Sequence, residues 1–167
     1  MKISVIGAVG LTLMLFLKPA LADEAGFLKS IEGSWSGNGS VTTKIGSRPF
    51  KVTCRFDSTV RGISLVMSGQ CRGLVVVRRA VSADIRADGT RYSGTYIGPS
   101  GRPSRLSGSR TGNSINFTVR WSRDINGDRT AQMTIEKIGT RGLRLRTIDN
   151  DPKTGRLIVT SDIRLTR

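Results

Sequence analysis

The chain contains no histidine. This absence excludes the Ser/His/Asp and Cys/His catalytic arrangements, and most zinc and haem sites, because each of them uses an imidazole. The lysines show no S-x-x-K pattern, so a Ser/Lys nucleophile is not indicated. Paired carboxylates stay open as a catalytic arrangement, although the twelve acidic residues are scattered and mostly sit at turns. We therefore expect a protein that is not an enzyme and that has no metal or other cofactor.

Long apolar runs are absent after the first 22 residues. The chain begins with Met1-Lys2, continues with an apolar run over residues 3–17, and then shows the small-residue pattern Ala20-Leu21-Ala22. This order is typical of a secretory signal peptide, and the run is short for a transmembrane helix, which needs about 20 residues. We expect residues 1–22 to be a cleaved signal peptide and residues 23–167 to be one periplasmic or secreted domain without a transmembrane segment. An uncleaved anchor is the alternative.

Acidic residues are few, since 12 Asp and Glu stand against 27 Lys and Arg, for a formal net charge of +15. Most of the cations are arginines, whose guanidinium groups pair bidentately with carboxylate and phosphate. Because export leaves no role for nucleic acid, the expected partners are an anionic lipid, an acidic glycan or an acidic protein. An arginine bias without function is the alternative. Arg102, Arg105 and Arg110, in the Gly/Ser/Pro-rich stretch 98–112, are the candidate anion-binding surface.

Aromatic residues make up only 5% of the chain, and apolar residues mostly alternate with polar ones between regularly spaced turn residues. We expect an all-β fold, a single antiparallel up-and-down β-barrel of about 8–10 strands, with a short N-terminal helix over residues 24–31. An outer-membrane barrel would instead need an apolar outer band with aromatic girdles. The predicted strands start near Trp35, Phe50, Ile63, Leu74, Arg91, Arg105, Ser114, Arg129, Leu143 and Arg156.

The two cysteines lie at mirror positions about a predicted turn at Gly62. On both flanking strands, alternation places the cysteine on the apolar face, so Cys54 and Cys71 should lie across from each other. An oxidising compartment favours pairing them. We predict a structural cross-strand disulfide.

Two predicted hairpins in the C-terminal half can be drawn in register. A two-residue turn at Asn126-Gly127 would bring an apolar face against a polar one, so we predict a three-residue loop over residues 125–127. This loop pairs residue 119 with 133 and residue 117 with 135. The next hairpin sets Glu136 opposite Arg144 on the outer face, a favourable cross-strand pair.

Several inward positions are candidates for ligand contact. Alternation over residues 74–85 places Arg79 on the inner, apolar face, where an unpaired guanidinium is costly. It therefore needs a ligand anion, an acidic partner, water at the barrel mouth, or a bulge that turns it outward. Tyr92 and Tyr96 flank Gly94, which would leave interior space, and Trp121 ends an inner apolar row. These aromatics either line a pocket or fill the core.

Gly33-Ser34-Trp35 at the start of the first strand, after a short helical turn, resembles the calycin group of lipocalins, fatty-acid-binding proteins and avidin-like barrels. This resemblance implies that Trp35 closes one barrel end and that a basic residue of the last strand, here Arg164, packs over it. The ten-strand pattern also looks like the haem-binding nitrobindin barrels, but their haem ligand is a histidine, which this chain lacks.

A weaker resemblance is to periplasmic metalloprotease inhibitors, which would insert residues 23–27 into a protease cleft. Two function classes follow. The first is a binding protein for a small apolar, amphipathic or acidic ligand inside the barrel. The second is an envelope or protein-interaction module with a solid barrel, protease inhibition included.

Overall fold

The computed structural model describes residues 20–73 and 77–167, and in them one helix precedes ten strands. Leu74, the predicted start of the fourth strand, and residues 1–19 of the predicted signal peptide lie outside the described residues. The elements are α1 (Ala20–Lys29), β1 (Gly33–Val41), β2 (Phe50–Arg61), β3 (Ser64–Gly73), β4 (Val77–Asp88), β5 (Arg91–Ile97), β6 (Pro103–Thr111), β7 (Ser114–Ile125), β8 (Asp128–Ile138), β9 (Gly142–Asn150) and β10 (Leu157–Thr166).

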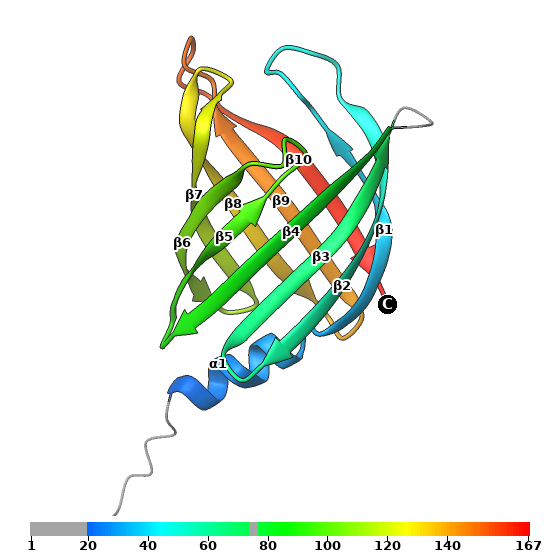
Figure 1. Cartoon of the computed structure of the whole chain (residues 1–167). Coiled ribbons are helices and arrows are strands. Elements are labelled where there is room, and N and C mark those ends of the chain that lie inside the picture. The colour runs from blue at the N-terminus through cyan, green and yellow to red at the C-terminus, as the bar shows by residue number, and fades with distance from the viewer. Residues whose placement is uncertain (1–19, 74–76) are drawn as a thin grey trace, which may run out of the picture.

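The strands form a closed antiparallel barrel in which each strand pairs with its neighbours in the sequence, and β1 pairs with β10 to complete the ring (Figure 1). This arrangement confirms the predicted all-β up-and-down barrel with a short N-terminal helix. The helix itself begins and ends earlier than the predicted 24–31. In the part of the chain that the structure describes, no helix has the length and hydropathy to cross a membrane.

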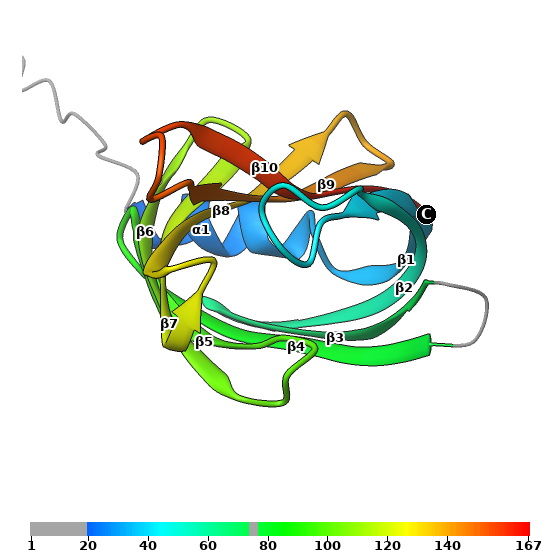
Figure 2. The same ribbon diagram turned by 90° about the horizontal axis from the view of Figure 1, so that it is seen from above.

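The two ends of the barrel differ. In an up-and-down barrel, alternate connections lie at the same end, so the β2–β3, β4–β5, β6–β7 and β8–β9 turns share one end, where α1 also lies (Figure 1). We call this the closed end. The opposite end, nearest the viewer in Figure 2, carries the longer connections 42–49, 98–102 and 151–156 and is called the open end.

The closed end is a packed hydrophobic core. Leu28 of α1 and Ile31 just after it are fully buried, and Trp35 is 1% exposed with its indole N–H donating to the Ile31 carbonyl at 2.8 Å. Inner residues of the strands complete this core, because alternation brings every second side chain inside. They include Leu65, Ile85, Ala87, Ile115, Phe117, Leu143 and Leu165.

A basic side chain does cover Trp35, but it is not the predicted one. The guanidinium carbon of Arg167 lies 4.6 Å from the centroid of the Trp35 ring, a distance typical of cation–π contact. Arg164 is exposed. The prediction for Arg164 was wrong because Ile163 and Leu165 are buried and the residue between them must point outward.

The disulfide prediction is confirmed. Cys54 and Cys71 are bonded, and they are directly opposite in the β2–β3 register. The turn between these strands contains Gly62 at φ +58°, a left-handed conformation that favours glycine. Cys54 is fully buried, whereas Cys71 is partly buried and packs at the edge of the core.

The predicted three-residue loop at the β7–β8 turn is wrong. Asn126 and Gly127 both have positive φ and form a two-residue turn, with Ile125 opposite Asp128. The register of the two strands then shifts between Ile125 and Arg120. Over residues 114–120 of β7, apolar inner residues therefore stand opposite apolar inner residues of β8. The observed pairs are Val119 with Ala131 and Phe117 with Met133. The extra residues that bring the two apolar faces together thus lie in an irregular segment of β7, and not in the turn.

Gly94 also differs from its prediction, since it leaves no interior space. A Cβ there would lie 2.1 Å from the carbonyl oxygen of Asp84 on β4. The backbones of β4 and β5 approach too closely for any side chain, as happens where a barrel strand bends sharply.

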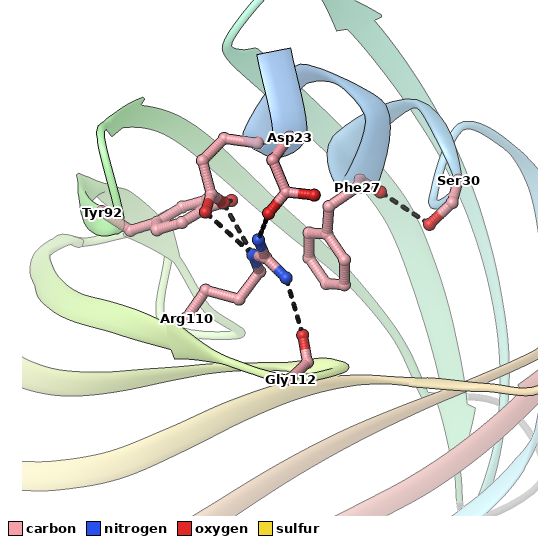
Figure 3. A network of polar contacts seen from close by, with 7 residues as sticks. Asp23, Phe27, Ser30, Tyr92, Arg110 and Gly112 are labelled. Carbon is pink, nitrogen blue, oxygen red and sulfur yellow. Dashed lines mark hydrogen bonds and ion pairs between the residues drawn. The ribbon is translucent and has the colours of Figure 1, made fainter. Parts of the chain in front are cut away.

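One ionic cluster ties α1 to the barrel wall (Figure 3). Glu24 is 1% exposed, and both of its carboxylate oxygens accept from Arg110 Nε, at 3.0 and 2.8 Å. The Tyr92 hydroxyl donates to the same carboxylate, and Arg110 also pairs with Asp23. The guanidinium lies 4.9 Å from the centroid of the Phe27 ring. We call Glu24, Arg110 and Tyr92 the helix clamp.

The helix clamp has two consequences. Its carboxylate holds the pKa of Arg110 above the ordinary value, and burial next to Glu24 raises the pKa of Tyr92. It also holds residues 23–27, the segment expected to enter a protease cleft, within a helix in which Glu24 is buried.

Removing the disulfide should lower stability without unfolding the barrel. The Cys54→Ser/Cys71→Ser double variant is expected to lose about 2–5 kcal/mol of unfolding free energy, because the denatured chain regains loop entropy. Urea denaturation of wild type with and without reductant measures the same effect independently. Identical midpoints for reduced and oxidised wild type would contradict this prediction.

Breaking the helix clamp should be more costly than breaking a surface pair. Glu24→Gln keeps the side-chain shape but leaves the Arg110 guanidinium without its buried carboxylate, so we expect a loss of about 3 kcal/mol. Glu136→Gln is the matched control, since Glu136 lies 4.0 Å from Arg144 on the outer face and should change stability by about 0.5 kcal/mol or less. Equal effects in thermal denaturation would show that the clamp is not structural.

Candidate functional site

A cavity of about 610 Å³ occupies the open half of the barrel. Its wall is mostly apolar and comes from nearly every strand, with Phe50, Phe56, Met67, Val81, Met133 and Ile163 among the lining residues. Several of the lining side chains are only partly buried, in contrast to the filled closed end. The barrel is therefore solid at the α1 end and hollow at the other.

Three predicted ligand contacts line this cavity. Arg79 is exposed and stands opposite Cys71 in the β3–β4 register, toward the open end, so its guanidinium is at the barrel mouth. Tyr96 and Trp121 lie deeper, with ring centroids 6.1 Å apart and planes tilted by 60°. Burial raises the pKa of the Tyr96 hydroxyl to about 12, so this group is a neutral hydrogen-bonding group at physiological pH.

Tyr92, the fourth predicted contact, is not part of the cavity wall. It is 2% exposed, stacks edge-on against Phe117, and belongs to the helix clamp at the closed end. Tyr92 and Tyr96 share a strand face but lie four residues apart along β5, which carries them toward opposite ends of the barrel.

The predicted anion-binding surface does not form as a cluster. Arg102 and Arg105 are exposed near the open end, whereas Arg110 lies at the closed end and is held inside by Glu24. Arg110 lies on the inner face of β6, because it follows Leu106 and Gly108 at alternate positions of the strand. The prediction failed for Arg110 because proximity in sequence was taken for proximity on one surface.

Sequence reasoning missed the most unusual polar group of the cavity. Asp149 on β9 lines the cavity and is 3% exposed. The Thr160 hydroxyl of β10 donates to its Oδ2, whereas Oδ1 has no hydrogen-bond partner among the described residues. Asp149 follows Leu143, Leu145 and Thr147 at alternate positions, and this alternation could have placed it on the inner face.

The charge state of Asp149 is set by its surroundings. Burial raises the pKa of this carboxyl above its ordinary value, while the Thr160 hydroxyl and the indole N–H of Trp121 oppose the rise. The indole N–H thus lies close to the carboxylate, but no hydrogen bond of regular geometry joins them, and the nitrogen is buried without a partner within the described residues.

The Asp149→Asn variant tests this burial through stability. A carboxyl whose pKa is raised by folding favours the folded state while it is protonated, and this contribution is lost as pH rises from its ordinary pKa through the raised one. A pKa that folding raises by one corresponds to about 1.4 kcal/mol of unfolding free energy. Wild type should therefore lose unfolding free energy as pH rises from 4 to 7, whereas Asp149→Asn should not. The difference in unfolding free energy should shift in favour of the variant over this range.

Denaturant titrations at several pH values measure that difference. Exposed Asp84 on β4 supplies the control variant Asp84→Asn, which should follow the wild-type pH profile. A parallel pH profile for Asp149→Asn and wild type would contradict a raised pKa at Asp149.

Comparison with known proteins finds similarity at the level of fold. No family model matches the chain, and no curated protein matches its sequence significantly. The crystal structure of Rv2717c from M. tuberculosis is similar, with a TM-score of 0.65 and 19% sequence identity over 90% of this chain and 98% of that chain. At this identity the likeness shows a shared overall fold and nothing more.

Proposed function

We propose that the protein is a non-enzymatic binding protein that holds a small apolar or amphipathic molecule in the cavity at the open end. One observation carries this proposal, namely a cavity of about 610 Å³ in a barrel that is filled at its other end. Ligand sites for small molecules are typically concave, mostly apolar and about 300–1,000 Å³ in volume. A solid barrel would not leave this space.

The polar groups of the cavity fit the same function. Such sites place a few polar groups within an apolar wall to orient the ligand. Arg79 at the mouth is accessible to an acidic head group, while Tyr96, Trp121 and Asp149 offer hydrogen-bonding groups further inside. An amphipathic ligand could thus bury its apolar part and keep one polar end near a partner.

We also propose that the chain is exported and that its barrel is calycin-like. Export is supported by the signal-like pattern of residues 1–22 and by the disulfide, which oxidising compartments favour. The calycin-like assignment is supported by Gly33-Ser34-Trp35 at the start of β1 and by the cation stacked over the Trp35 ring.

A second candidate, recognition of an anionic partner by the outer surface, has one specific observation in its favour. An open groove runs over Asn38 and Ser40 on β1, and it is flanked by three cations, Lys51, Arg72 and Arg164, and by one acidic residue, Asp162. Salt-sensitive binding of anionic vesicles that is lost on neutralising these three cations would favour this candidate.

Filling the cavity should weaken ligand binding. The test uses the uncharged fluorescent probe N-phenylnaphthylamine, whose emission rises in an apolar site. We expect saturable binding of one probe molecule per chain to wild type. Ala83→Trp, which places an indole inside the cavity, should weaken this binding by at least about tenfold, or about 1.4 kcal/mol.

Ala80→Trp is the matched control, because Ala80 lies on the same strand but is exposed and outside the cavity lining. It should bind the probe like wild type. Val81→Trp is a second filling variant in case Ala83→Trp does not fold, which circular dichroism would reveal. Absence of saturable binding, or equal binding by the inner and outer variants, would overturn the proposal.

A further inference from the structure

Residues of the cavity wall carry one buried acceptor and two buried donors without partners among the described residues, the second donor being Arg146 Nε on β9. In the described part of the chain, Asp149 Oδ1 and Trp121 Nε1 are both buried and unpaired. Buried polar groups of this kind are rare in folded proteins and call for an explanation, such as a bound molecule. Both residues line the same cavity.

The two groups belong to one corner of the barrel. Val119, Ala131 and Asp149 form a row across β7, β8 and β9, and Trp121 is the next inner residue of β7 after Val119. The small Ala131 side chain lies beside Asp149 in this row. Thr160 of β10 completes the corner by donating to Asp149 Oδ2, which leaves Oδ1 as the free acceptor.

The indole meets the carboxylate with its N–H edge. The Trp121 N–H opposes the burial-induced rise in the pKa of Asp149, so the donor lies near the carboxylate oxygens. This edge carries positive partial charge, whereas the negative face of the ring is the part that attracts cations. A molecule bound at Oδ1 therefore meets a hydrogen-bond donor and not an aromatic face.

We propose that this corner recognises an uncharged hydroxyl group at the end of an apolar ligand. A hydroxyl both donates and accepts, so one oxygen can donate to Asp149 Oδ1 and accept from Trp121 Nε1–H. An ammonium group donates only and leaves the indole N–H unpaired. A carboxylate accepts only and is repelled by Asp149.

The charge of the rest of the molecule disfavours a cationic ligand. The chain carries a formal net charge of +15, and Arg79 stands at the cavity mouth, so a cationic ligand would enter against a positive field. Most of the remaining wall is apolar, which suits an aliphatic body. This inference deepens the proposed function and rests on it.

A chain-length-matched series tests the head group. 1-Decanol, its methyl ether, decylamine and decanoate are each used to displace N-phenylnaphthylamine from wild type at pH 7. We expect decanol to compete at a concentration at least about tenfold below the other three, because it alone satisfies both groups. Trp121→Phe, which keeps a ring but removes the N–H, should weaken decanol binding by about tenfold.

Two further variants sharpen the test. Asp149→Leu removes the acceptor and should weaken decanol binding to a similar extent while the probe still binds. Trp35→Phe is the matched control for the indole, since Trp35 lies at the closed end outside the cavity lining. It should bind decanol like wild type, whatever its effect on stability.

The outcomes separate this inference from the proposed function. If decylamine competes best and Asp149→Leu abolishes that advantage, the corner is an ammonium site and the inference is overturned. Equal competition by all four compounds, or a decanol affinity unchanged in Trp121→Phe, overturns it as well. If wild type does not bind the probe at all, the proposed cavity function fails first.

Discussion

The rest of the structure depends on the pairing of β1 with β10, because this pairing turns a ten-strand meander into a barrel with no exposed edge. The two backbones approach so closely that a Cβ at Gly37 would lie 2.0 Å from the Arg164 carbonyl oxygen, and one at Gly39 would lie 2.3 Å from that of Asp162. Only glycine fits at these two positions, because there is no space for a side chain. The closed ring then gives α1 an end to seal and encloses a cavity.

The asymmetry of the interior follows from having one helix and two ends. At the closed end, α1 supplies Leu28 and is followed by Ile31, and both side chains fill the space between the strands. The helix clamp holds this segment in place through a buried carboxylate that would be costly without Arg110. The open end has no second helix among the described residues. Its inner side chains therefore border open space, and a buried carboxylate such as Asp149 persists there at a cost in stability, as is common at functional sites.

The arginines illustrate how one composition serves several physical roles. Arg110 is a half-buried partner of the buried Glu24, and Arg167 stacks on Trp35 at the closed end. Arg144 bonds Asp162 on the outer face, which holds the pKa of the Asp162 carboxyl below its usual range. Arg79 stands at the mouth of the cavity. The net charge alone therefore does not identify an anion-binding surface, because some of the guanidinium groups already have partners within the chain.

The predicted fold was largely correct because its determinants are local. Alternation specifies which face of a strand is buried, and turn residues mark where each strand ends, so the barrel, the Cys54–Cys71 bond and the pairing of Glu136 with Arg144 could be predicted. The β7–β8 register could not, because a two-residue turn with a bulge and a three-residue turn both restore the match of faces. The site was predicted only in part, since Arg79, Tyr96 and Trp121 line the cavity but Tyr92 does not.

The sequence by itself determined the strand alternation, the turns and the inner or outer side of most residues, because these depend on neighbours along the chain. Only the tertiary structure decided how deep each inner residue lies along the barrel axis. That depth separates Tyr92 in the helix clamp from Tyr96 in the cavity, and it brings Trp121, Asp149 and Thr160 to one corner from three different strands. It depends on the stagger between neighbouring strands and on where α1 packs, and both arise from contacts between residues far apart in the sequence.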